Sequence, residues 1–413
     1  MRTQRPDLMF IVVLVVGVLL AVGLTWVGQT MIVPLGGDEV FAPLWEAARY
    51  ANTHESGNPY LANAVAKAKI LLEDEPSPPR FVYPYYSLIL FVPISLISPY
   101  SLARAVWMTF TLICSVGLCY TGLVLTRWRP RVGMMLLFLV FSLGSFHAAR
   151  ALFLGNPAVV VSLLVGVGLL LVVRDNDGLA GIFLGLSIIK PQMVVLLLPF
   201  VLVWAVSQRR MSLVWSLLGT MGILVGGSFY FFPQWFLYQY QQLLMFFSES
   251  FPSSPSAVVW TWLPRSGPNV MMFFAIGLGI WLLVEWWKSF GKDVRWFLWT
   301  SALTLVMTNL IGVPTSLSNH IVLIVPFVLV FSIWVQRWKE NGGRLAAVVM
   351  VLILLLEWGL AYLTMGGRLD ASPAPLMFFY YPVVALLLLY WARYWALNSV
   401  RMKVSHLEAL RRL

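Results

Sequence analysis

"LMFIVVLVVGVLLAVGLTW" occupies residues 8–26, and the polar stretch "VPLGGDEVFAPLWEAARYANTHESGNPY" follows it at 33–60. The first stretch is long enough to cross about 30 Å of hydrocarbon as a helix. Arg2 and Arg5 precede it, as in a secretory signal peptide, but no small-residue cleavage site follows, so we expect a retained membrane helix. The second stretch then places acidic and basic side chains within a few turns of the end of that helix.

The composition extends this pattern to the whole chain. Its 413 residues are 60% hydrophobic and 11% charged, whereas soluble domains are about 25% charged. Apolar runs of roughly 17–22 residues recur, which predicts an all-α polytopic membrane protein without a sizeable soluble domain. The net charge of +11 does not by itself indicate nucleic-acid binding. Cys114 and Cys119 lie inside one apolar run, so we expect lipid- or core-facing thiols rather than a disulfide or a metal site.

The hydrophobic runs predict about twelve membrane spans. We place them at 8–27, 101–126, 132–149, 157–173, 178–190, 191–207, 211–231, 267–287, 294–312, 320–336, 345–364 and 375–396. The apolar piece "YPYYSLILFVPISLISP" (83–99) is left out, because it is short and its three prolines each remove a backbone donor. We expect it to form a juxtamembrane or re-entrant helix that is shielded by protein.

The basic residues decide the orientation of these spans. If 83–99 does not span the membrane, the clusters of basic residues and both termini lie on the cytoplasmic side. Most of the 28 Lys and Arg residues are then cytoplasmic, as the positive-inside rule requires. The clusters lie at 127–131, 174, 208–210, 288–295, 336–344 and in the tail at 397–413. If 83–99 did span, every later cluster would be translocated. Residues 28–100 and 232–268 are therefore expected to be external loops, with isolated charges of both signs at the outer membrane boundary.

A transporter would place polar residues and helix breaks near the middle of the bilayer, often in two matching halves. We find no internal repeat. Glu357 is the one acid clearly inside a predicted span, where a hydrogen bond to a neighbouring helix is the simplest role. The Lys190–Pro191 break faces outward in this topology. The polar chemistry is therefore expected at one surface of the membrane.

Several short motifs in the sequence are similar to those of one protein family. They are "GGDEVFAPLWEAARY" (36–50), "SGNPY" (56–60), "RFVYPYY" (80–86), "LGNPAVVVSLLVGVGLLL" (154–171), "AGIFLGLSIIKPQ" (180–192) and "PTSLSNHIVLIVPF" (314–327). In this order they resemble the GT-C membrane glycosyltransferases, and more closely glycosyltransferase family 87, the polyprenyl-phosphate-mannose-dependent mannosyltransferases and related arabinosyltransferases. The resemblance implies a catalytic core over 8–336 within a single integral membrane domain (1–413), extra helices over 337–396 and a basic tail over 397–413.

The chemistry of such a transfer needs one general base near the acceptor hydroxyl. A sugar carried on a lipid phosphate brings its own leaving group, so a second paired acid is not required. Asp38 is the predicted base, because it follows Gly36–Gly37 just beyond the first helix; its alternative role is a helix cap. Glu39 is the alternative base. No Asp/Glu/His cluster has good metal-ligand spacing, so no metal or other cofactor is expected, although the Asp38–Glu39 pair leaves a metal alternative.

The departing phosphate needs positive charge or hydrogen-bond donors. His320 lies where the resemblance places an active-site histidine and is predicted to contact the donor phosphate or the catalytic carboxylate. Lys190 is predicted to bind phosphate, with snorkelling to the interface as its alternative. Further candidates at outer helix ends are the cations His147, Arg150 and Arg265, the amides Asn156 and Asn319 for sugar hydroxyls, and Tyr83 for an acceptor or lipid groove. Each of these also has an ordinary interfacial role.

Together these features predict an inverting membrane glycosyltransferase. It would transfer a sugar from a polyprenyl-phosphate donor to a hydroxyl of a lipid-linked glycan or glycolipid at the extracytoplasmic face of the cell membrane. Mannose is the sugar that we expect. The expected partners are that donor, that acceptor and membrane lipids, without nucleic acid. A lipid or glycolipid transporter or flippase is the competing class. A structural scaffold is a third interpretation, which the charged outer loop weakens.

Overall fold

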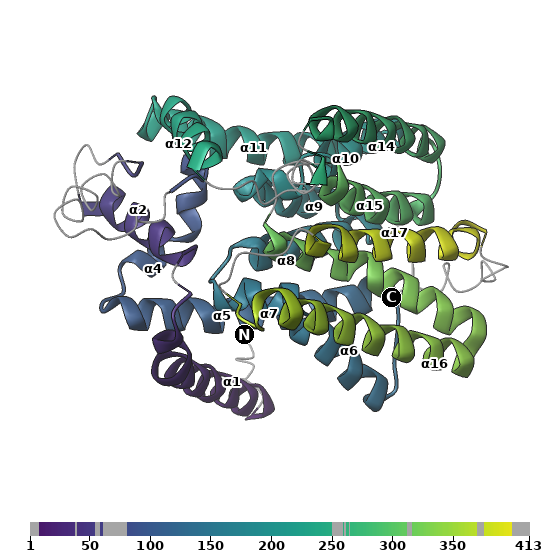
Figure 1. Ribbon diagram of the computed structural model, residues 1–413, viewed down its shortest axis with the longest axis horizontal. Helices are drawn as coiled ribbons and strands as arrows, with labels where there is room; N and C mark the ends of the chain where they lie inside the picture. The colour runs from purple at the N-terminus through teal and green to yellow at the C-terminus, as the bar shows by residue number, and fades with distance from the viewer. Residues whose placement is uncertain are drawn as a thin grey trace, which may run out of the picture.

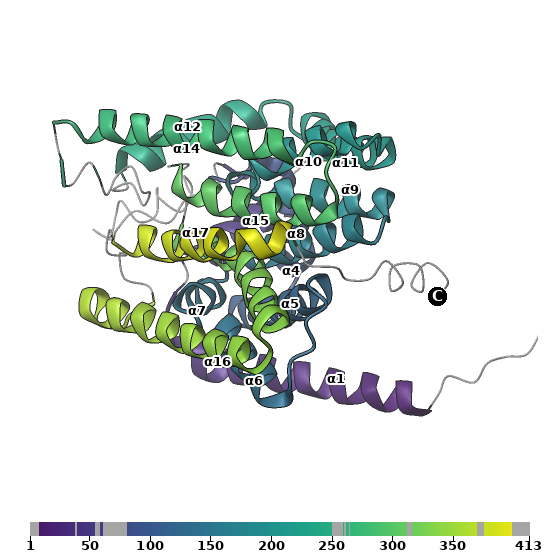
Figure 2. The same ribbon diagram turned by 90° about the vertical axis from the view of Figure 1, so that its right-hand side faces the viewer.

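The computed structural model describes residues 8–37, 39–53, 58–60, 81–249, 259, 262–263, 265–311, 316–369 and 376–398. Across these ranges the secondary structure is entirely helical, which confirms the predicted all-α class. Most helices lie side by side and run across the molecule in the same general direction (Figures 1 and 2).

The first helix ends in a glycine turn. The helix α1 (Leu8–Val27) continues through η1 (Gly28–Ile32) and η2 (Val33–Leu35). Gly36 and Gly37 then have φ values of 91° and 89°, a region that side chains with a Cβ rarely adopt. The chain turns there and enters α2 (Phe41–Thr53), whose inner face buries Phe41, Leu44 and Ala48. Asp38, the residue after Gly37 in the sequence, lies outside the described residues.

The proline-rich piece at 83–99 does not form one straight helix. It forms two short helices, η3 (Tyr85–Leu90) and α4 (Val92–Ser95), because its prolines interrupt the backbone hydrogen-bond ladder. The indole of Trp45 in α2 donates to the carbonyl of Ile94 at 3.2 Å, and Asn52 donates to the Ser95 hydroxyl at 3.0 Å. This piece therefore packs beside α2.

The remaining elements form the helical body. They are α5 (Tyr100–Leu125), α6 (Val132–Gly144), α7 (Phe146–Phe153), α8 (Ala158–Val173), α9 (Asp177–Leu186), η4 (Ser187–Ile189), η5 (Pro191–Met193), α10 (Leu197–Ser207), α11 (Met211–Phe231), α12 (Trp235–Glu249), α14 (Gly267–Ser289), α15 (Val294–Leu310), η6 (Leu317–Leu323), α16 (Ile324–Met365) and α17 (Leu376–Leu397). The core lies around α8 and α15, and every residue of α15 from Trp299 to Leu310 is buried. Cys114 and Cys119 are buried free thiols.

Small residues bring two of these helices unusually close. A Cβ at Gly181 of α9 would clash with the Ser216 hydroxyl of α11, and one at Gly185 would lie 2.7 Å from Thr220 Cβ. Gly181 and Gly185 are four residues apart and therefore share one face of α9. Close approach of backbones at small residues is typical of helix packing in membranes, where the hydrophobic effect does not drive helices together.

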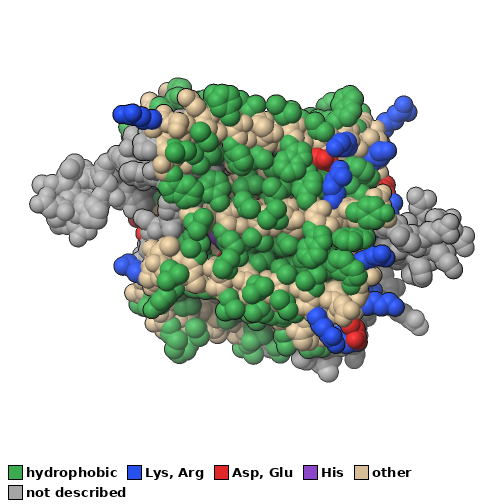
Figure 3. All heavy atoms as spheres, turned by 45° about the vertical axis from the view of Figure 1, so that its right-hand side comes forward, with side chains coloured by type: hydrophobic (Ala, Val, Ile, Leu, Met, Phe, Trp, Pro, Cys, Tyr) green, Lys and Arg blue, Asp and Glu red, His purple; other side chains and the backbone are tan. Residues whose placement is uncertain are grey.

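Among the described residues, six helices are long and apolar enough to cross a membrane, or seven if the bent pair α6–α7 counts as one span. The predicted segments at 157–173, 178–190 and 191–207 form shorter apolar helices, and the segments at 320–336 and 345–364 are joined in α16, which breaks at Lys339. The structural finding is therefore six or seven candidate spans, and the predicted count of about twelve is not confirmed by it. Hydrophobic side chains cover much of the face in Figure 3, and basic side chains gather along one edge of it.

Loops that were assigned to one side of the membrane lie together. Arg131 pairs with Glu340 at 3.3 Å, which joins the basic clusters at 127–131 and 336–344. Gln208 donates to the Lys292 carbonyl at 3.0 Å, which joins the clusters at 208–210 and 288–295. These contacts support the predicted grouping of the basic clusters at one end of the helical body.

Candidate active site

The short helix α7 carries two of the predicted cations. It follows α6 after a bend of 54°, and the Ser145 hydroxyl caps it by accepting from the Ala148 N–H. His147 is buried on this helix, with its Nδ1 3.1 Å from the carbonyl oxygen of Leu317. A ring nitrogen opposite a carbonyl must carry the proton, so this contact fixes the neutral tautomer with Nδ1–H donating and Nε2 accepting.

A second histidine lies against the first. The rings of His147 and His320 have centroids 4.7 Å apart, and the ring of Tyr381 from α17 packs on both, at 4.5 Å from His147 and 6.3 Å from His320. His320 is fully buried in η6, and neither of its ring nitrogens has a hydrogen-bond partner in the described part of the chain. Buried polar atoms without partners are rare and costly, so His320 is a strong candidate for contact with a substrate.

Lys190 and Asn156 form a second buried polar pair. The Lys190 ammonium donates to Asn156 Oδ1 at 2.6 Å, and the same oxygen accepts from the Ala158 N–H at 3.0 Å, at the start of α8. Lys190 lies between η4 and η5, where Pro191 interrupts the apolar run. The ammonium is 5.9 Å from the ring centroid of Tyr83, a cation–π distance. The structure thus brings Tyr83, Asn156 and Lys190 together from three distant parts of the sequence.

The surroundings of Tyr83 favour hydrogen bonding. Burial raises the pKa of the Tyr83 hydroxyl, so this group stays protonated and able to donate. Its backbone carbonyl accepts from the Tyr60 hydroxyl at 3.0 Å, which ties 58–60 to the proline-rich segment. Tyr83 therefore presents a neutral polar aromatic side chain beside the ammonium.

Arg104, near the start of α5, has a fully buried side chain. It donates to the carbonyl oxygens of Val33 at 3.4 Å, of Phe153 at 3.3 Å and of Gly36. It therefore ties the turn before residue 38 to the end of α7. In the sequence, Arg104 is recognisable only as a charged residue near the start of an apolar segment. The fold shows which carbonyl oxygens it contacts.

The other predicted residues have mixed positions. Arg150 is buried on α7 and donates to the Leu369 carbonyl, whereas Asn319 is buried in η6 beside His320. Glu39 and Arg265 are exposed. Within the described ranges no group of three His, Cys, Asp or Glu side chains is arranged to hold a metal ion.

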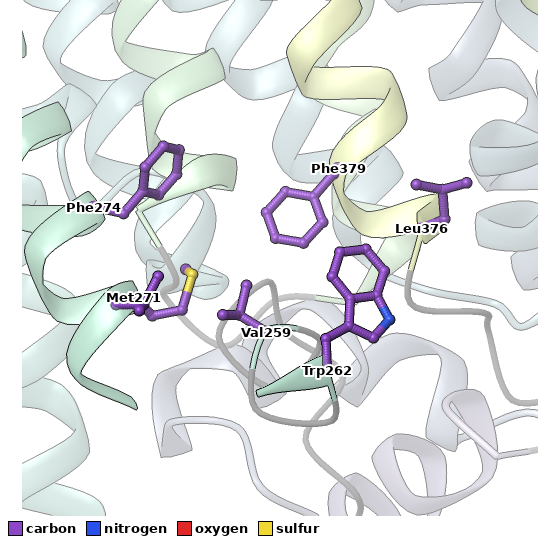
Figure 4. Close-up of a pocket in the computed structure, with 7 residues that line it drawn as sticks. Val259, Trp262, Met271, Phe274, Leu376 and Phe379 are labelled. Atoms are coloured by element: carbon purple, nitrogen blue, oxygen red, sulfur yellow. The ribbon is translucent and has the colours of Figure 1, made fainter. Parts of the chain in front are cut away.

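An apolar pocket of about 340 Å³ opens near the start of α17. Figure 4 shows Phe379 and Leu376 of α17 facing Trp262, Met271 and Phe274 around this space. Phe379 and Tyr381 are two residues apart, about 200° around a helix, so they point to opposite sides of α17. The helix thus lies between the apolar pocket and the two histidines.

This arrangement of buried cations and donors, next to helices able to span a membrane, can stabilise an anionic oxygen such as that of a phosphate. No curated protein matches the sequence significantly. The sequence profile described as glycosyltransferase family 87 matches residues 81–363, which is more than half of the chain and includes Tyr83, Asn156, Lys190 and His320. The profile thus extends over both polar pairs, and the chain belongs to glycosyltransferase family 87.

Proposed function

We propose that the protein transfers a sugar from a polyprenyl-phosphate donor to a hydroxyl of a lipid-linked glycan or glycolipid, and that this sugar is mannose. Membership of the family supports glycosyl transfer between a sugar donor and an acceptor. The choice of a lipid-phosphate donor is supported by the position of the buried cations next to helices that can span a membrane. Inversion follows from a single displacement with one base.

The observation that carries this proposal is the buried Lys190 ammonium. Its described hydrogen-bond partner is the neutral amide of Asn156, and no ion pair with a described carboxylate accompanies it. A buried ammonium costs free energy unless an anion compensates it. We propose that the phosphate of the donor lipid is this anion, bound by Lys190 as a point charge.

His320 supplies a further donor in the proposed site. His147 donates its Nδ1 proton to the Leu317 carbonyl, so its Nε2 is an acceptor and cannot donate to a phosphate oxygen. His320 has both nitrogens available among the described residues. We propose that His320 contacts the departing phosphate oxygen or the catalytic carboxylate, and that His147 and Tyr381 hold its ring in place.

We propose Asp38 as the general base that takes the proton from the acceptor hydroxyl, with Glu39 as the alternative. The supporting feature is the Gly36–Gly37 turn, which Arg104 anchors against the end of α7. A base near the membrane boundary is within reach of a donor whose tail remains in the bilayer. Arg150, Arg265, Asn319 and Tyr83 remain secondary candidates for contacts with donor or acceptor.

We further propose the orientation that the charge distribution favours. The chain is one integral membrane domain in the cell membrane, with about twelve spans, both termini in the cytoplasm and the site on the extracytoplasmic side. The difference between this count and the seven candidate spans consists of the short apolar helices α8, α9 and α10, of α15, and of α16 counted as two spans.

A lipid transporter is the alternative function, since it too would bind a lipid phosphate. The two are separated by incubating the purified protein with a polyprenyl-phosphate sugar that is labelled in the lipid. Release of free polyprenyl phosphate that depends on the acceptor supports the glycosyltransferase. Movement of intact donor across a vesicle membrane without release would overturn it.

A further inference from the structure

The break between α6 and α7 is held by two neighbouring residues of α16. The Trp358 indole donates to the carbonyl oxygen of Gly144 at 2.7 Å, on one side of Ser145. The Glu357 carboxylate accepts from the N–H of Phe146 at 2.8 Å, on the other side. Glu357 and Trp358, about 210 positions further along the sequence, therefore bond the two neighbours of Ser145. Ser145 itself has an extended backbone, with ψ 144°.

Such a break needs partners inside a membrane. A bend of 54° in an apolar helix pair releases backbone C=O and N–H groups that lipid cannot satisfy. The Trp358 indole satisfies one of the released carbonyls and the Glu357 carboxylate one of the released N–H groups. The ring of Phe146 also packs edge-on against the ring of Trp358, with centroids 5.5 Å apart. Side-chain packing and both hydrogen bonds therefore fix the same point.

The choice of a carboxylate at this point needs explanation. Glu357 is fully buried, and burial of a carboxylate is expensive when a neutral acceptor would satisfy the same N–H. The first turn of α7 offers compensation, because the positive end of its helix dipole faces the carboxylate. An acceptor at this point thus favours one direction of α7, with the N–H groups of its first turn pointing at Glu357.

We propose that Glu357 and Trp358 are positioning residues for the candidate active site. They fix the direction of α7, and His147 directly follows the Phe146 N–H that Glu357 binds. His147 in turn lies against His320, so a tilt of α7 would disturb the whole histidine pair. This inference rests on the proposed function, because the reaction is what the positioned histidines would serve.

The test compares substitutions that remove the hydrogen bonds with one that keeps them. Glu357→Leu and Trp358→Phe remove one contact each, whereas Glu357→Gln keeps an acceptor oxygen for Phe146 and removes only the ionisable group. We expect Glu357→Leu to lower kcat/KM for the donor on the order of tenfold to a hundredfold, because misplacement by about 1 Å can have this effect. Trp358→Phe should show a smaller loss, and Glu357→Gln should recover most of the activity.

The matched control is Glu285, another buried carboxylate, which bonds Lys288 and Arg393 between α14 and α17. Glu285→Gln should lower the thermal stability but leave the kinetics of the folded enzyme unchanged. In the double variant Glu357→Leu/His147→Ala the two losses of kcat/KM should not be additive, because both substitutions act through α7. Additive losses, or Glu357→Gln as inactive as Glu357→Leu, would overturn positioning, and the second result would indicate a proton-transfer role instead.

A readout without turnover keeps this inference separate from the proposed function. Hydrogen–deuterium exchange of the full-length protein should show faster exchange of the α7 amides in Glu357→Leu than in wild type, and no change in Glu285→Gln. Unchanged α7 exchange would overturn the inference. A wild-type protein that transfers no sugar would count against the proposed function alone.

Discussion

The Lys190 ammonium donates to the amide oxygen of Asn156 across 2.6 Å, with both side chains buried. The amide leaves the charge of the lysine uncompensated and so available to an anionic ligand. Asn156→Asp would supply an internal counter-ion, and we expect the KM for the donor to rise about tenfold or more, the equivalent of about 1.4 kcal/mol or more. The thermal stability should not fall, because an Asp carboxylate can also accept from the Ala158 N–H at the start of α8.

Asp177→Asn is the control for that variant. Asp177 pairs with Arg210 in a different part of the chain, where α9 begins. This substitution should lower the thermal stability and leave the donor KM unchanged. A normal donor KM in Asn156→Asp would contradict a phosphate site at Lys190.

Removing the proposed phosphate ligands should have a larger effect. Lys190→Ala or His320→Ala should each lose a charge-assisted bond of roughly 1.5–3 kcal/mol, or about one to two decades in rate. The measurement is steady-state transfer with a labelled donor, together with a melting curve that shows a folded protein. If both variants kept wild-type kinetics, the phosphate site would have to lie at Arg150 or Arg265.

The sequence indicated several single residues of this site but not their grouping. Lys190 was marked by the proline that follows it, and His320 by the polar turn before it. Tyr381 gave no such signal, because a tyrosine near the end of an apolar helix is ordinary, and its contact with both histidines depends on how α17 packs. Arg104 was similarly visible only as a charge, since its partners are backbone carbonyl groups.

Helix lengths were predicted better for isolated runs than for joined ones. The predicted spans at 211–231 and 375–396 closely match α11 and α17, because charged or proline-containing loops bound them, and the span at 8–27 matches α1, although η1 and η2 continue it to Leu35. The run at 178–207 instead forms α9, η4, η5 and α10, since the Lys190–Pro191 break distorts more than one residue. Hydrophobicity alone also did not reveal that α6 and α7 meet at 54°, which depends on contacts from Glu357 and Trp358.

The close packing of α9 on α11 gives a prediction about stability. Gly181→Ala places a methyl group against Ser216 and the backbone of Leu217, and we expect it to destabilise the protein by about 1–3 kcal/mol, as overpacking does. Gly178→Ala on the same helix meets no atom within 4 Å and should be neutral or slightly stabilising. Denaturation of both variants in one detergent checks this, and equal midpoints would contradict the packing.

The proposed orientation can be checked by cysteine labelling. Both native cysteines are buried, so added exposed cysteines should dominate the reaction with a membrane-impermeant maleimide. Thr53→Cys, at the exposed end of α2, should react in intact cells, and Asn341→Cys, exposed near the break in α16, only after permeabilisation. Labelling of Asn341→Cys in intact cells would reverse the orientation and place the histidine pair on the cytoplasmic side.

The last prediction concerns the proposed base. Arg104 ties the Gly36 carbonyl, two residues before Asp38 in the sequence, to the end of α7. Asp38→Asn keeps the shape of the side chain and any capping bond, because Asn caps a helix about as well as Asp. It removes only the ability to accept a proton. We therefore expect donor binding to persist while transfer falls by about two to four decades, the usual effect of a general base.

Glu39→Gln is the matched control for that variant, one residue along the chain and exposed. It should retain near-normal transfer if Asp38 is the base. Normal transfer in Asp38→Asn with an inactive Glu39→Gln would move the role to Glu39. Activity in both variants would leave the proposed reaction without a base at this turn and would favour the transporter, since a transporter binds the donor phosphate without needing to deprotonate an acceptor.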